Sequence, residues 1–182
     1  MRKLKAKDAR VLIIGSGGSE HALGIQMEVD GVNRVFFAPG NGGTAEIGTN
    51  VQISPNDFKS LLELVKNEGI DLVIVGPEDP LANGIVDVFR ANEIPIIGPT
   101  RMAAQIESNK IFARTLMAHA MVPQPLFFPC LDREMSEAII SGIGLPAVLK
   151  ISGLAAGKGA FVCQNDNDLN EALKAIYEDK RF

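Results

Sequence analysis

The chain has 182 residues, of which 46% are hydrophobic and 22% are charged, with a net charge of −4. This composition is that of a globular protein with room for one complete domain and part of a second, and it excludes disordered and collagen-like chains. The charges of both signs are interspersed, so the chain has no general attraction for nucleic acid or anionic membranes. No apolar run approaches the roughly 18 residues of a membrane span.

The two cysteines, Cys130 and Cys163, lie far apart and form no CxxC pair. They predict neither a disulfide framework nor a zinc site, and we interpret both as packing residues. Reduced cysteines of this kind are typical of a cytoplasmic protein.

The first hundred residues alternate between short apolar runs and segments of helical periodicity. The predicted strands are 10–14, 34–38, 71–75 and 94–97, and the predicted helices are 19–29, about 54–69 and 82–92. Ser54 is the predicted cap of the second helix, and Gly69 is its predicted end. Because the strands are almost continuously apolar, they are expected to be buried on both faces. This pattern predicts a doubly wound parallel α/β sheet as an N-terminal domain over residues 1–102.

The alternation of predicted strands and helices stops after this domain. Residues 103–120 are predicted to form one helix, and the three prolines of residues 123–129 are expected to end it. A helix over 132–141, a strand over 147–151, a strand over 160–163 and a helix from Asp166 should follow. We assign residues 103–122 to a helical linker that starts a second domain. Residues 123–182 would be an incomplete subdomain of it.

The first glycine-rich motif, GSGGSEHAL, spans Gly15 to Leu23 between the first strand and the first helix. Glycines at this turn bring the backbone close to a ligand, and the free N–H groups of the helix favour a phosphate. A dinucleotide fingerprint requires a third glycine where this chain has Glu20, and an acidic residue where the second strand ends in Ala38. A nicotinamide cofactor is therefore not expected. A turn without a ligand is the alternative.

Three more loops rich in glycine or proline follow strands: APGNGGT (38–44), GPEDP (76–80) and GPT (98–100). Loops after parallel strands gather at the carboxyl edge of the sheet, where ligands bind. They predict a substrate cleft in which Glu78 and Asp79 are exposed carboxylates. The alternative is that these two residues belong to a solvated turn.

The second glycine-rich loop, GLAAGKG, spans Gly153 to Gly159 between two strands. It is not a Walker loop, because only three residues separate its first two glycines and Gly159 follows Lys158. Small residues, free backbone N–H groups and a lysine can nevertheless cover a triphosphate, and Lys150 would end its strand near the same phosphates. A glycine-rich hairpin with surface lysines is the alternative.

Six segments in one order closely resemble the N-terminal part of the glycinamide ribonucleotide synthetases, also called phosphoribosylamine–glycine ligases. They are GSGGSEHAL, APGNGGT, DLVIVGPEDPLANGIVD, IIGPT, AAQIESNKIFAR and PAVLKISGLAAGKG. The similarity spans nearly all of residues 10–163. It implies an N-terminal substrate domain followed by the beginning of an ATP-grasp domain.

The resemblance also implies an activity. In that family ATP phosphorylates the carboxylate of glycine, and the amine of 5-phosphoribosylamine attacks the acyl phosphate to give glycinamide ribonucleotide, ADP and phosphate in purine biosynthesis. It implies ATP and Mg²⁺ or Mn²⁺ as cofactors, with the metal ligands expected beyond Phe182. The partners would be these small molecules and, in some parent chains, other purine-synthesis domains.

The resemblance further implies site residues. For ATP they are Lys110, Lys150, Ser152, Gly153, Leu154, Ala155, Ala156, Gly157, Lys158 and Gly159. For phosphoribosylamine they are Gly17, Gly18, Asn41, Gly42, Gly43, Thr44, Gly76, Pro77 and Glu78. No catalytic residue and no metal ligand is assigned within the chain.

The chain departs from the family pattern at Ser19, where the family has arginine, and at Gly42, where it has alanine. A hydroxyl binds phosphate more weakly than a guanidinium, which bears on phosphoribosylamine binding. The family's ligase unit is more than twice as long, so we expect this chain alone to be inactive. The alternatives are a non-catalytic module that binds a sugar phosphate or a nucleotide, and an ATP-grasp ligase for another amine.

Overall fold

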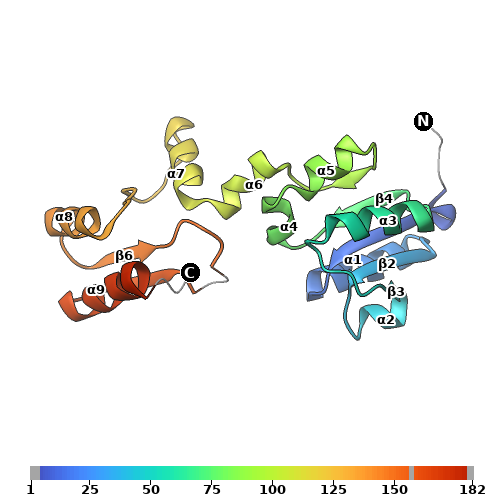
Figure 1. The fold of residues 1–182 in the computed structure, drawn as a ribbon, viewed down its shortest axis with the longest axis horizontal. Helices are drawn as coiled ribbons and strands as arrows, with labels where there is room; N and C mark the ends of the chain where they lie inside the picture. Colours follow the sequence, from blue (N-terminus) through green and yellow to red (C-terminus); the bar gives the residue numbers. More distant parts are fainter. Residues whose placement is uncertain (1–4, 156–157, 180–182) are drawn as a thin grey trace. The chain divides into compact units, whose positions relative to one another are not determined.

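A computed structural model describes residues 5–155 and 158–179. The chain forms two compact units, Met1–Ala104 and Gln105–Phe182, each containing its own β-sheet (Figure 1). In the described part of the chain, no helix has the length and apolar character that crossing a bilayer requires.

The first unit is built on a parallel sheet. Among the described residues its five strands have the order β3-β2-β1-β4-β5. They are β1 (Arg10–Gly15), β2 (Arg34–Pro39), β3 (Thr49–Asn50), β4 (Leu72–Val75) and β5 (Ile96–Ile97). The predicted parallel α/β sheet is confirmed. Strand β3 was not predicted, because it is two residues long and lacks an apolar run.

Helices cover both faces of this sheet (Figure 1). The helical segments described in this unit are η1 (Ala6–Asp8), α1 (Gly18–Val29), α2 (Thr44–Ile47), α3 (Phe58–Glu68), α4 (Glu78–Ala82) and α5 (Ile85–Ala91). From β1, Leu12 and Ile14 join a buried cluster with residues of α3 and α5. Val11 and Ile13 join a second cluster, against which residues of α1 and α2 pack. Strand β1 is therefore apolar from Val11 to Ile14 because both of its faces are covered there.

Two predictions about helix ends in this unit were wrong. The cap of α3 is Asp57, whose carboxylate accepts the N–H of Ser60 at 3.1 Å, whereas Ser54 belongs to the turn before it. Gly69 ends α3 in the left-handed conformation, as predicted. The helix predicted over 82–92 begins later than expected, as α5 at Ile85, while α4 ends at Ala82, because Gly84 has a φ of +92° and cannot continue an α-helix.

The second unit carries a two-stranded antiparallel sheet and several helices. Its elements are α7 (Lys110–His119), α8 (Arg133–Ile143), β6 (Ala147–Lys150), β7 (Ala160–Cys163), α9 (Asp166–Leu173) and the π-helical segment η2 (Lys174–Glu178). Helix α6 (Arg101–Ser108) contains the division between the units. The single helix predicted over 103–120 was wrong, because Asn109 is extended, with φ −136° and ψ 100°.

The hairpin and helices α8 and α9 hold the core of the second unit. Ile140, Cys163 and Leu173 are buried there. The hydroxyls of Ser136 and Tyr177 lie 2.7 Å apart, joining α8 to η2. Burial raises the pKa of the Cys163 thiol, and Asp168 raises it further. Cys163 is therefore a packing residue, as the sequence indicated.

Candidate functional site

The carboxyl edge of the parallel sheet gathers the glycine-rich loops of the first unit. Strands β2 and β3 lie on one side of β1, and β4 and β5 lie on the other, so the connection reverses direction between β1 and β4. In open α/β sheets ligands bind outside the strand ends at such a reversal. The loops that flank it are Gly15–Gly18 after β1 and Gly76–Glu78 after β4.

The side chain of Glu20 lies between these two loops. Its side chain is buried, with 6% of the residue exposed, and its Oε2 accepts the N–H of Gly17 at 2.6 Å. A Cβ added at Gly15 would lie 2.6 Å from Glu20 Cδ, and one added at Gly76 would lie 1.9 Å from Oε1. The Glu20 carboxylate therefore occupies the space beside both strand ends, and a side chain at either glycine would force it to move. Glu20 replaces the third glycine of a dinucleotide fingerprint with a structural carboxylate.

A polar network fixes the loop after β2. The Thr44 hydroxyl accepts the N–H of Asn41 at 2.7 Å and lies 2.8 Å from Asn50 Oδ1. Asn50 Nδ2 donates to the carbonyl of Asn41 at 2.7 Å, and Thr44 N donates to Asn41 Oδ1 at 3.0 Å. Thr44 is fully buried. Its side chain therefore holds the loop and does not face solvent.

The loops after β1 and β2 also contact each other. Asn41 Nδ2 donates to the carbonyl of Ser16 at 2.8 Å, with a longer contact of 3.5 Å to that of Gly17. The ring of His21 on α1 fills the space beside Gly43, where a Cβ would lie 2.4 Å from the ring Cε1. His21 is thus a packing residue in this structure, which agrees with the more frequent role of a histidine in a first helical turn.

The predicted phosphoribosylamine residues differ in exposure. Gly17, Gly18, Gly42, Gly76 and Glu78 are exposed at the carboxyl edge. Asn41, Gly43 and Pro77 are half-buried, and Thr44 is buried. The loops that follow β1, β2 and β4 thus present glycine backbone and the carboxylates of Glu78 and Asp79 to solvent, a surface suited to a polar ligand.

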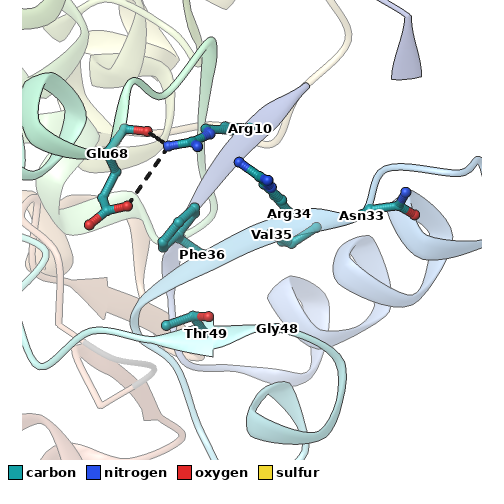
Figure 2. Close-up of a pocket in the computed structure, with 8 residues that line it drawn as sticks. All are labelled: Arg10, Asn33, Arg34, Val35, Phe36, Gly48, Thr49 and Glu68. Carbon is teal, nitrogen blue, oxygen red and sulfur yellow. Dashed lines mark hydrogen bonds and ion pairs between the residues drawn. The ribbon is translucent and has the colours of Figure 1, made fainter. Parts of the chain in front are cut away.

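A pocket of about 320 Å³ lies elsewhere in the first unit (Figure 2). It is lined by Arg10, Asn33, Arg34, Val35, Phe36, Gly48, Thr49 and Glu68. Arg10, Arg34 and Thr49 begin their strands, so the pocket is at the amino edge of the sheet, away from the glycine-rich loops. The Arg10 guanidinium is already engaged by the carbonyl and the carboxylate of Glu68. The topology therefore favours the carboxyl edge as the candidate site.

In the second unit, the β6–β7 hairpin has one face that carries a lysine. Val148 pairs with Val162, and Lys150 pairs with Ala160. These four residues are exposed, whereas the alternating residues are half-buried or, at Cys163, buried. Because strand side chains alternate between faces, Lys150 shares an exposed face with the two valines. Such a face offers an apolar surface beside a positive charge.

The second glycine-rich loop begins where this hairpin opens. Ile151 N donates to the carbonyl of Gly159 at 2.8 Å, which closes the base of the loop. Lys110 Nζ donates to the carbonyl of Gly153 at 2.9 Å, so this lysine of α7 lies at the start of the loop. Leu154 and Lys158 are exposed, Ala155 and Ser152 are half-buried, and Ala156 and Gly157 lie outside the described residues.

The described residues offer no metal centre. No group of three His, Cys, Asp or Glu side chains among residues 5–155 and 158–179 is arranged to hold an ion. These side chains do not fit a divalent cation on their own.

Family models match both units. The model of the phosphoribosylglycinamide synthetase N domain matches residues 9–107, and the model of the ATP-grasp (A) domain of the same synthetase matches residues 108–182. The chain belongs to the phosphoribosylglycinamide synthetase family. The resemblance read from the six segments is thus confirmed.

Relatives of this family are similar along almost the whole chain. The phosphoribosylamine–glycine ligase of Vibrio parahaemolyticus is 42% identical over 176 residues, which are 95% of this chain and 41% of that ligase. The trifunctional purine biosynthetic protein adenosine-3 of Gallus gallus is 41% identical over 177 residues, 95% of this chain and 18% of that protein. The chain therefore spans only part of the relatives it matches. A non-catalytic module is not favoured.

Solved structures support the same fold. The phosphoribosylamine–glycine ligase of Thermotoga maritima matches with a TM-score of 0.75 and 26% identity, over 91% of this chain and 39% of that one. The N5-carboxyaminoimidazole synthetase of Staphylococcus aureus complexed with ADP matches with a TM-score of 0.78 and 21% identity, over 97% of this chain and 46% of that one. The second likeness shows the shared fold only.

Sequence reasoning missed three residues that organise these loops. Glu20, Asn50 and Asn109 were not assigned a role in the site, yet each holds a glycine-rich segment in place. For Glu20 a signal was present, since an acidic residue three positions after Gly17 can accept the N–H of that residue at the start of a helix. Asn50 and Asn109 gave no comparable signal, because their partners are side chains and loops that only the fold brings near.

Proposed function

We propose that this chain is the front part of a phosphoribosylamine–glycine ligase that joins glycine to 5-phosphoribosylamine at the expense of ATP. The observation that carries the proposal is the 42% identity to such a ligase over 95% of the chain, which includes both units. The exposed glycine-rich loops of the first unit and the lysines beside the second loop support it.

The chemistry makes two demands on the protein. The γ-phosphoryl group of ATP passes to a carboxylate oxygen of glycine, releasing ADP. The amine nitrogen of phosphoribosylamine then attacks the acyl carbon and loses a proton, and phosphate leaves with the electrons of the broken C–O bond. The protein must hold the reactants in line and must neutralise the charge on the phosphates.

For ATP we propose Lys110, Lys150 and the loop from Ser152 to Gly159. Lys150 is exposed beside Val148 and Val162, which gives a point charge next to an apolar surface. Lys110 lies at the start of the loop through its bond to Gly153. When bound, ATP would supply the phosphoryl group that turns the glycine carboxylate into an activated acyl group.

For phosphoribosylamine we propose the loops 15–18, 40–44 and 76–78. Exposed backbone N–H groups at Gly18 and Gly42 suit a sugar phosphate, whereas the N–H of Gly17 already donates to Glu20. Thr44 and Glu20, which are buried, would maintain the conformation of these loops through hydrogen bonds to their backbone.

A divalent cation would use ligands from the part of the ligase that the matched region does not include, since this chain corresponds to 41% of its Vibrio relative. Mg²⁺ and Mn²⁺ both suit oxygen ligands and phosphates. A cytoplasmic location and, in some parent chains, further purine-synthesis domains belong to the same proposal. The trifunctional relative supports the second of these.

The test is glycine-dependent ADP release, measured with MgATP and with phosphoribosylamine generated in the assay. We expect none from the 182-residue chain. We expect turnover when the chain continues to the length of its relatives, and in that protein Lys150→Met should lower kcat/KM for ATP by about a hundredfold. Lys66→Met on α3 is the matched control, because Lys66 is exposed in the first unit.

ADP release that does not depend on glycine would refute the assignment of glycine as the acceptor. ADP release that requires glycine but not phosphoribosylamine as the amine would instead favour a ligase for another amine. Full turnover by the 182-residue chain would show that the reaction needs less of the fold than proposed.

A further inference from the structure

The break between α6 and α7 is joined to the second glycine-rich loop by a pair of polar side chains. The hydroxyl of Ser152 donates to Asn109 Oδ1 at 3.0 Å. The same hydroxyl oxygen accepts the N–H of Ile111 at 3.2 Å, and Asn109 Oδ1 also accepts the N–H of Phe112 at 3.0 Å. Asn109 thus caps α7 and holds Ser152 with one oxygen atom.

Two further hydrogen bonds come from the next residue. The backbone N–H of Lys110 donates to the carbonyl of Ser152 at 2.9 Å, and Lys110 Nζ donates to the carbonyl of Gly153 at 2.9 Å. The extended backbone of Asn109 ends α6 and allows α7 to start at Lys110, directly against the loop. The first residues of α7 and the first residues of the loop are therefore held together.

The Ser152 hydroxyl has no remaining capacity to donate. It has one hydrogen, which Asn109 accepts, and one of its lone pairs already takes the N–H of Ile111. Donating to a phosphate would require breaking the bond to Asn109. Ser152 is thus poorly suited to touch a nucleotide directly, although it lies within the segment expected to bind one.

We propose that Asn109 and Ser152 are positioning residues that fix Lys110 and the start of the loop before a triphosphate binds. The inference rests on the proposed function, because it concerns the same nucleotide site. A lysine side chain has many rotamers, and restricting them in advance lowers the entropy lost on binding. The Lys110 ammonium uses one of its three N–H groups on Gly153, so two remain for phosphate oxygens.

The test measures MgATP affinity of the 182-residue chain by amide chemical-shift titration, following Gly153 and Gly159. Ser152→Ala and Asn109→Ala should each weaken binding about fivefold, the value of one hydrogen bond. Ser152→Thr keeps the hydroxyl and should restore affinity. The loss of affinity in the double variant should be less than the sum of the two single losses, because both single variants break the same Asn109–Ser152 hydrogen bond.

Gln124→Ala is the matched control. Gln124 Nε2 donates to the carbonyl of Arg114 at 3.0 Å, so this variant also removes a side-chain hydrogen bond to α7 but away from the loop. It should lower the unfolding midpoint as much as Ser152→Ala does, with unchanged MgATP affinity.

The outcomes distinguish the positioning role of Asn109 and Ser152 from the proposed function of the chain. A wild-type chain that binds MgATP, with Ser152→Ala binding equally well, overturns the positioning role and leaves the proposed function intact. Equal weakening by Gln124→Ala also overturns it, since the effect would then be general destabilisation. A wild-type chain with no shifts at Gly153 or Gly159 at millimolar MgATP overturns the nucleotide site in this chain, and the inference with it.

Discussion

The Glu20 carboxylate accepts the backbone N–H of Gly17 at 2.6 Å while it fills the space beside Gly76 at the end of β4. One buried acidic side chain therefore connects the loops after β1 and β4, which flank the reversal point of the sheet. A substitution at Glu20 should therefore alter the conformation of both loops.

Replacing Glu20 by alanine removes this hydrogen bond and leaves a cavity between the strand ends. We expect Glu20→Ala to lower the free energy of unfolding by about 2–4 kcal/mol. Glu20→Gln keeps the size of the side chain and an acceptor oxygen, so it should lower the free energy of unfolding by only about 1 kcal/mol. Urea unfolding at pH 7 measures both, and equal stability of the alanine variant and the wild type would contradict the structural role.

A methyl group at Gly76 has no room, because its Cβ would lie 1.9 Å from Glu20 Oε1. Gly76→Ala should destabilise the first unit by about 1–3 kcal/mol through overpacking. At Gly18, a Cβ would meet no atom within 4 Å, so Gly18→Ala should be neutral or stabilising by up to about 1 kcal/mol. Thermal unfolding of the two variants compares them. If Glu20→Ala does not relieve part of the Gly76→Ala defect, the clash with Glu20 is not its cause.

The buried Thr44 hydroxyl provides a third prediction. Thr44→Val keeps the shape but leaves the N–H of Asn41 without its hydroxyl partner, at a cost of about 1–3 kcal/mol. Thr44→Ser keeps the hydroxyl and loses one methyl group, at a cost of about 1 kcal/mol. In denaturant unfolding, Thr44→Ser should therefore have a higher free energy of unfolding than Thr44→Val. The reverse order would show that methyl packing matters more than the hydrogen bonds.

The cap of α3 should make stability depend on acid pH. Hydrogen bonds from Ser60 hold the pKa of Asp57 below its ordinary value of 3.8. Because the pKa is depressed in the folded state, the stabilisation is present above pH 3.8 and is lost as the pH falls through the folded pKa. The stability gap between wild type and Asp57→Ala should thus shrink below pH 3.8. A gap that persists to low pH would show that the charged carboxylate is not its source.

The two thiols should differ in reactivity. Burial raises the pKa of Cys163 above its ordinary value of 9.0, so its thiolate is disfavoured while the protein is folded. Any stabilisation linked to this group is present below pH 9.0 and is lost as the pH rises through the folded pKa. Iodoacetamide at pH 8 should modify the half-buried Cys130 first and Cys163 only after unfolding. Equal rates in the folded chain would contradict the burial of Cys163.

Much of the fold follows from local patterns. The first strand is apolar from Val11 to Ile14, and burial on both faces of a parallel sheet is the physical reason for that pattern. Gly69 likewise ends α3 in the left-handed conformation that glycine adopts at low cost. The breaks at Gly84 and Asn109 were not predicted, because helical periodicity continues through both of them.

The sequence by itself determined the alternating α/β pattern, the glycine-rich loops and the resemblance that the family models confirm, because periodicity, turn residues and motif order are properties of neighbouring residues. Only the tertiary structure decided that Glu20 lies between Gly17 and Gly76, that Asn50 secures the loop of Asn41, and that Asn109 holds Ser152. Two of these contacts, Glu20 with Gly76 and Asn109 with Ser152, join residues more than forty positions apart, and only chain folding brings such residues together.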